Sequence, residues 1–229
     1  GKGDRVIISR RNDVIPYLEE VLEHKGKKFP IPAKCPSCDH ATEVEGKFLI
    51  CPNDGCKALY LGNLQKWIVK NEIMDISYAT IEKLFQAGLV VKPSDFYTFS
   101  AKDFAKLDRL GEKSAKKLLD QLHSKMEIDL PTFIGGLNMS SFSNSQCEKL
   151  VDAGYDTIEK LLGLNEDKLC KIPGIKEKIA KKIVDGLNQK RDVIDELLAV
   201  GIKVKKPVKV VIKKDSDKLA GMSFVFTGA

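Results

Sequence analysis

The spacing of apolar and polar residues divides the chain into short extended segments at both ends and a long helical middle. Residues 4–9 have the composition of a strand, and Val21 and Leu22 suggest a second one. Two short strands do not form a stable sheet by themselves, so this segment is expected to be the last part of a β-domain. From Asn63 onward, helical patterns follow one another with short connections, which predicts a compact helical domain.

The helix boundaries are predicted from capping residues and from the length of each periodic segment. The expected helices are 64–71 after an Asn63 cap, a helix from a Ser77 cap to Gly88, 101–107 after a Ser100 cap, and segments near 112–124, 129–134, 144–153, 156–163, 165–170, 176–189 and 191–200.

The helical domain contains an internal repeat. KLFQAG at 83–88 recurs as KLVDAG at 149–154, and AKKLLDQL at 115–122 recurs as AKKIVDGL at 180–187. The two offsets, 66 and 65 residues, are nearly equal. The helical domain is therefore predicted to be a duplication.

The pattern changes again after Gly201. Residues 202–214 alternate apolar and basic residues around Pro207, which suggests a strand or an extended linker. Residues 222–228 have the composition of a strand that reaches a turn, and they are expected to begin a further domain.

Four of the six cysteines are closely spaced, as Cys35-x2-Cys38 followed by Cys51-x4-Cys56. Two such knuckles can place four thiolates around one Zn²⁺ ion per chain. Four protein ligands leave the metal no open position for water, so a structural role is expected. The alternatives are two disulfides in a secreted module, or His40 in place of one cysteine.

Composition narrows the class of protein. The 229 residues carry a formal charge of +6, which suits a polyanionic partner such as DNA. Because no apolar run approaches the roughly 18 residues that span a bilayer, and the start resembles no signal peptide, we expect a soluble, cytoplasmic, monomeric protein without membrane contact. The remaining cysteines, Cys147 and Cys170, are expected to be core thiols.

The repeat places a glycine turn and then lysines at the start of a helix, in residues 110–115 and again in residues 172–180. Glycine allows close approach of a ligand, and the free N–H groups of a helix start attract an anion. Lysines oppose the helix dipole there, so a nearby phosphate would explain them. This arrangement is typical of a helix–hairpin–helix module that holds the DNA backbone without reading bases. The candidate DNA-binding residues in these hairpins are Gly111, Lys113, Ser114, Gly174, Lys176 and Lys178.

A helical corner with a solvated lysine face is the alternative for each hairpin. Two further corners, around 75–78 and 138–143, lack the glycine and are expected to pack as scaffold. The fold class is therefore mainly α: a duplicated helix–hairpin–helix domain, a small four-cysteine zinc finger and short β segments at the ends.

The order of these parts resembles that of NAD⁺-dependent DNA ligases, downstream of their nucleotidyltransferase domain. GDRVIISRRNDVIP at 3–16 is similar to the end of that family's OB fold, and the four cysteines resemble its zinc finger. MDISYATIEKLFQAGLV and LDRLGEKSAKKLLDQL resemble its helix–hairpin–helix segments, and GMSFVFTG resembles the opening of its BRCT domain. The second cysteine pair departs from the family's usual spacing by one residue. The resemblance implies four parts: 1–28 from the OB fold, 29–62 as the zinc finger, 63–202 as the helix–hairpin–helix domain in two tandem halves, and 203–229 as a linker and the first BRCT strand.

The resemblance implies a role in sealing nicks in double-stranded DNA, independent of sequence, in replication and repair. Arg10 matches the family's phosphate-contacting arginine, and Val14 and Ile15 match apolar residues that press on the minor groove. Packing within the strand is the alternative for the apolar pair, and a solvated charge at the end of a strand is the alternative for Arg10. No Lys-x-Asp-Gly adenylation motif occurs in the chain. We therefore expect no catalytic residue here, and an upstream adenylation domain of the same polypeptide that uses NAD⁺ and Mg²⁺.

Two other functions fit the same residues. One is a non-enzymatic zinc and helix–hairpin–helix module that binds DNA or acts as a scaffold in a repair complex. The other is a protein-interaction scaffold with solvated lysines. Salt-dependent, sequence-independent binding to duplex DNA would separate the first two functions from the third.

Overall fold

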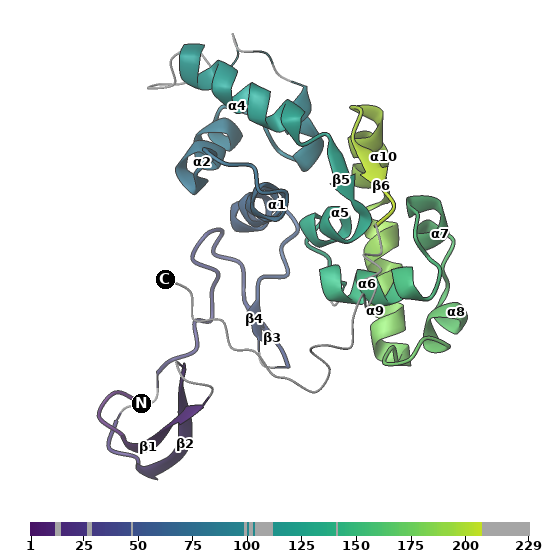
Figure 1. Ribbon diagram of the computed structural model, residues 1–229. Coiled ribbons are helices and arrows are strands. Elements are labelled where there is room, and N and C mark those ends of the chain that lie inside the picture. The colour runs from purple at the N-terminus through teal and green to yellow at the C-terminus, as the bar shows by residue number, and fades with distance from the viewer. Residues whose placement is uncertain are drawn as a thin grey trace, which may run out of the picture. The chain divides into compact units, whose positions relative to one another are not determined.

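The computed structural model describes residues 1–11, 15–26, 29–46, 48–98, 100, 103, 112–140 and 142–207. The chain divides into two compact units, Gly1–Leu59 and Tyr60–Ala229 (Figure 1). The expected strand at 222–228 and nearly all of the expected helix at 101–107 lie outside the described residues. No helix in the described ranges is both long enough and apolar enough to cross a membrane.

The first unit begins with an antiparallel hairpin of β1 (Arg5–Arg11) and β2 (Ile15–Glu23). This hairpin confirms the predicted strand at 4–9 and extends the second strand well beyond Val21 and Leu22. Apolar side chains remain exposed on it, among them Ile8 and Ile15, as expected where two strands alone provide too little core.

The second part of this unit holds the cysteine knuckles. A short antiparallel pair, β3 (Glu43–Glu45) and β4 (Phe48–Ile50), lies between them. A bridge between Lys34 and Ala41 closes the first knuckle. Each cysteine pair is therefore presented by a tight turn beside a small hairpin.

The second unit is helical, in agreement with the predicted fold class. Its elements in chain order are α1 (Lys57–Lys70), which begins just before the unit, α2 (Tyr78–Gln86), the 3₁₀ helix η1 (Pro93–Tyr97), α4 (Glu112–Ser124), β5 (Glu127–Asp129), α5 (Leu130–Gly136), α6 (Asn144–Asp152), α7 (Ile158–Leu162), α8 (Glu166–Cys170), α9 (Glu177–Gln189), α10 (Arg191–Ala199) and β6 (Lys203–Lys205).

The start of α1 was predicted wrongly, because the helix begins at Lys57 rather than after Asn63. The N–H of Leu59 already bonds to the carbonyl of Cys56, so the second cysteine knuckle continues directly into the first helical turn. Asn63 lies inside the helix, and its side chain accepts a hydrogen bond from Asn138 (2.9 Å) instead of capping. Asparagine is a common helix cap, but here it makes a tertiary contact instead.

A continuous apolar core joins the helices of the second unit. Trp67 is fully buried and meets Phe133 edge to face, with ring centroids 5.6 Å apart. The indole N–H donates to the hydroxyl of Tyr97 (3.1 Å), and burial raises the pKa of Tyr97 to about 12. Gly136 lies against the same indole: a Cβ there would come within 2.9 Å of the ring.

The backbone confirms the duplication. Helix α2 follows Ser77 and helix α6 follows Ser143, 66 positions later. At the same offset, Glu72 and Asn138 share left-handed φ angles of 51° and 54°, and Gly88 and Gly154 both have positive φ. Equivalent positions in the two halves therefore adopt the same turns before and after equivalent helices.

A parallel strand pair joins the segment between the two halves to the segment after them. β5 and β6 lie side by side, with Ile128 opposite Val204 (Figure 1). The N–H of Lys203 also donates to the carbonyl of Met126 (2.8 Å). The extended segment predicted after Gly201 therefore begins as part of the helical unit.

Candidate metal centre and nucleic-acid interface

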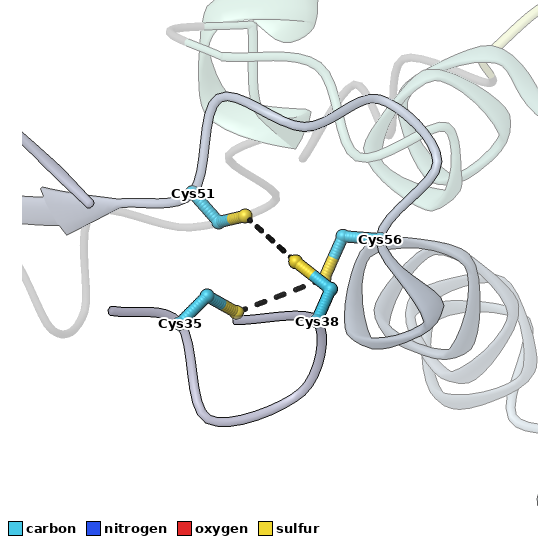
Figure 2. A group of neighbouring side chains, drawn as sticks. All are labelled: Cys35, Cys38, Cys51 and Cys56. Carbon is cyan, nitrogen blue, oxygen red and sulfur yellow. Dashed lines mark hydrogen bonds between the residues drawn. The ribbon is translucent and has the colours of Figure 1, made fainter. Parts of the chain in front are cut away.

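The four predicted metal ligands converge (Figure 2). The sulfur atoms of Cys35, Cys38, Cys51 and Cys56 all lie within 4.8 Å of one another. Two of the separations are 3.8 Å, between Cys35 and Cys56, and 3.5 Å, between Cys38 and Cys51. Four thiolates placed tetrahedrally at about 2.3 Å from a metal ion would be separated by about 3.8 Å. The cluster therefore has the size that a metal ion with four sulfur ligands requires.

The two alternatives considered for this site do not fit. All the cysteines are free, and the Cys38–Cys51 separation greatly exceeds the roughly 2.05 Å of a disulfide. His40 is not part of the group of converging ligand atoms. Its backbone carbonyl instead accepts the N–H of Cys35 (2.8 Å), which shapes the first knuckle.

The knuckles shift the pKa values of two of these thiols in opposite directions. A hydrogen bond from the Asn53 side chain, assisted by the backbone at His40, lowers the pKa of Cys38 to about 6. The backbone N–H of Asn53 acts in the same direction on Cys51, but burial and the neighbouring thiols together raise the pKa of Cys51 to about 12. A cation among these sulfurs would offset the mutual repulsion of their thiolates.

The hairpin at Gly174 is the best-defined part of the predicted DNA-binding surface. Two buried side chains, Ile172 and Ile175, anchor its ends in the core. The N–H of Ile175 bonds to the carbonyl of Ile172 (3.1 Å) and closes the turn. Gly174 adopts a φ of 83°, the left-handed region that favours glycine. Ile172 and Ile175 thus hold the turn against the core, and its tip consists of the exposed Pro173 and Gly174, of which Gly174 carries no side chain.

Helix α9 begins immediately after this turn. Its N-cap residue, Lys176, makes no side-chain capping bond. The amides of Glu177 and Lys178 have no acceptor among the described residues. The side chains of Lys176 and Lys178 are exposed, and with Cys170 they border a shallow depression of about 510 Å³. Free amides, a bare glycine and two lysines are the groups that bind a phosphate.

Cys170 was expected to be a core thiol, and that prediction was wrong: its side chain is exposed. It is the last residue of α8, a short helix that buries Leu169 on its inner side. The next side chain, that of Cys170, lies on the outer side of the helix. Cys147 is fully buried, as predicted, and burial raises its pKa to about 12.

Lys149 joins the Gly174 hairpin although the sequence reasoning did not select it. Its Nζ lies 3.7 Å from the position that a Cβ on Gly174 would occupy. It extends from α6, on the neighbouring hairpin of the same half, and its side chain is exposed. The repeated KL motif contained this residue, but only the three-dimensional structure brings its ammonium group to the turn.

The equivalent hairpin of the first half is described in part. Gly111 lies outside the described residues, as does the side chain of Ser114. Lys113 is exposed in the first turn of α4. Of the three residues predicted to contact DNA in this hairpin, the structure thus describes the side chain of Lys113, at the start of α4.

Arg10 and Ile15 lie on the β1–β2 hairpin of the other unit. Arg10 pairs with Pro16 in the strand register, and both border a shallow depression of about 360 Å³ with Ile8 and Ser9. Ile15 is 72% exposed. Val14 lies outside the described residues. Since Ile15 is little covered within the hairpin, packing inside the strand pair does not account for it.

Comparisons with known proteins agree with this arrangement. A family described as a SAM-like helix–hairpin–helix tandem matches residues 144–189, which include the Gly174 hairpin and Lys149. Over 100% of its length the chain is 44% identical to a protein from Sorangium cellulosum named DNA ligase, and it covers 33% of that protein. Proteins of the same name from Treponema denticola and Aquifex aeolicus are 33% and 32% identical over 99% of the chain, which covers 35% and 32% of them.

The resemblance to DNA ligases that the sequence motifs indicated is therefore confirmed along the whole chain. The chain spans about a third of the length of these relatives.

Proposed function

We propose that this chain is the DNA-holding, C-terminal part of an NAD⁺-dependent DNA ligase. The observation that carries the proposal is the Gly174 hairpin, in a chain similar to DNA ligases along its whole length. It offers free backbone amides and exposed lysines, the groups that contact phosphates without regard to sequence. Nicked duplex DNA of any sequence is the ligand that such a surface fits.

The hairpin would bind a phosphate in two ways. The amides at the start of α9 donate hydrogen bonds, and the positive end of the helix dipole favours the anion. The ammonium groups of Lys176, Lys178 and Lys149 add charge from the sides of the turn. Gly174 leaves room for a phosphate oxygen to reach the backbone. The hairpin at Gly111, with Lys113 and Ser114, would repeat these contacts on the first half of the duplication.

Arg10, Val14 and Ile15 would add a different kind of contact. We assign Arg10 to a phosphate and the two apolar residues to the edge of the minor groove. The exposure of Ile15 and Arg10 on the β1–β2 hairpin supports this assignment. A strand hairpin that exposes both charge and apolar surface suits the sugar–phosphate edge of a duplex.

The four-cysteine site would hold one structural Zn²⁺ ion. Its sulfur separations match a tetrahedral site, and four protein ligands leave no position for water or substrate. Removing the metal or replacing Cys51 with serine should therefore unfold the knuckles rather than stop a chemical step. Elemental analysis should find one zinc per chain, and a purified chain without zinc would contradict this assignment.

The covalent steps would belong to an upstream adenylation domain of the same polypeptide, which uses NAD⁺ and Mg²⁺. This chain would keep the nick aligned while that domain acts. Extending the polypeptide upstream should give a protein that seals nicked duplex with NAD⁺ but not with ATP. Sealing with ATP alone would refute the proposed cofactor, and no sealing with either would favour a non-enzymatic DNA-binding module.

DNA binding itself is tested on the chain as it stands. Binding to several unrelated nicked duplexes should be of similar strength and should weaken steeply with salt. Replacing Lys176 and Lys178 with methionine should weaken all duplexes equally and reduce the salt slope by about 2. Loss of affinity for only one sequence would indicate base readout and contradict the proposed function.

A further inference from the structure

The hairpin between α1 and α2 has the backbone plan of the Gly174 hairpin. Ile73 and Ile76 are buried at its ends, as Ile172 and Ile175 are at the ends of the other. Between them Asp75 adopts a φ of 64°, close in kind to the 83° of Gly174. A residue other than glycine rarely adopts this conformation, and aspartate is one of the few that do so readily. The turn itself is therefore retained without the glycine.

The chemistry at the tip of this turn is reversed. The Asp75 carboxylate pairs with Lys117 of α4 at 2.7 Å and also accepts from Gln121 at 3.4 Å. It thereby uses a lysine of the helix that follows the Gly111 hairpin. Where Gly174 leaves a bare backbone, Asp75 presents a negative charge.

The cap of the following helix also differs. Ser77 occupies the position equivalent to Lys176, and its hydroxyl accepts the N–H of Thr80 (3.2 Å). The equivalent amide in α9, that of Ile179, is likewise bonded, to the carbonyl of Lys176 (2.8 Å), so the difference at the cap is the missing lysine. Two independent substitutions, Asp75 at the tip and Ser77 at the cap, thus stand in place of the bare glycine and of a lysine that would face a phosphate.

We propose that Asp75 excludes the DNA backbone from this hairpin and turns it into a brace for α4. The inference rests on the proposed function, because it concerns which of the repeated corners the duplex touches. Like charges repel, so the carboxylate opposes a phosphate at the same place where Gly174 admits one. Lys117, held by Asp75, is also kept from the duplex. Contact is thereby restricted to the corners that retain glycine.

The test is a gain of binding. Asp75→Gly should tighten binding to nicked duplex by about fivefold at 0.1 M salt, and the slope of affinity against salt should steepen by about 1, since one phosphate contact is added. The double variant Asp75→Gly with Ser77→Lys, which restores the glycine and the first lysine of the Gly174 hairpin, should gain more than the single variant. Glycine adopts the required φ without strain, so folding is preserved, and circular dichroism checks this.

Asp195→Asn is the matched control. Asp195 is an exposed acid on α10, and its replacement changes the net charge equally without touching a hairpin. Unchanged affinity and salt slope in both Asp75 variants, or an equal gain in the control, would overturn the inference while leaving the proposed function intact. A wild-type chain that binds no duplex would overturn both.

Discussion

Replacing Gly174 with alanine separates backbone strain from loss of DNA contact. The turn has a φ of 83°, and a left-handed conformation costs a residue with a Cβ about 1–2 kcal/mol. The space is available, because the new Cβ would meet only the flexible end of Lys149, at 3.7 Å. The folded protein should therefore survive, with its melting temperature lowered by about 2–8 °C. The methyl group would nevertheless stand where a phosphate oxygen must approach the backbone, beside the Lys149 ammonium.

Gly154→Ala provides the matched control. Gly154 has a φ of 93°, and a Cβ there would meet nothing within 4 Å. Both variants should lose a similar amount of thermal stability, measured by circular dichroism, but only Gly174→Ala should bind nicked duplex more weakly. Fluorescence anisotropy well below both melting temperatures measures that difference on folded protein. Equal DNA affinity of the two variants would refute the assignment of the Gly174 turn to the phosphate.

Three further outcomes follow from the structure. Lys149→Met should reduce the salt slope of DNA binding by about 1 and leave the melting temperature nearly unchanged, and an unaltered slope would exclude this ammonium from the interface. Gly136→Ala should destabilise the folded state by about 1–3 kcal/mol in urea unfolding, because its Cβ would come within 2.9 Å of the Trp67 ring. A neutral effect would mean that the core there is loosely packed. A hydrogen bond from Lys92 lowers the pKa of Glu196. The pair thus adds stability above the ordinary carboxyl pKa of about 4.3, and this contribution is lost as pH falls through the lower, folded-state value. In Glu196→Gln, unfolding between pH 6 and 3 should depend less on pH than in the wild type, and identical pH profiles would contradict this.

Local patterns predicted the helices and the metal ligands well, because the physical cause of each lies in neighbouring residues. The helices predicted at 176–189 and 191–200 match the observed α9 and α10 to within one residue at each end. The cysteine spacing identified the four converging sulfurs, because each knuckle is a short turn whose geometry its own residues impose.

Features set by distant contacts were not predictable in the same way. Asn63 has a good capping side chain, but Asn138 bonds to it from the other half of the duplication. Lys149 reaches the Gly174 turn only because α6 packs near it. The missing glycine at Asp75 indicated a different corner, but sequence could not show that aspartate preserves the turn and pairs with Lys117.

The pairing of β5 with β6 holds together the two ends of the second half of the duplication. Ile128 and Val204 face each other across a parallel ladder, and Ile128 is almost completely buried. The chain between these two residues forms a closed loop without a covalent crosslink. Separation of β5 from β6 would therefore release this whole segment at once. The amides of this ladder should therefore be among the slowest to exchange with heavy water, and they would report when the whole half comes apart rather than when one of its helices frays.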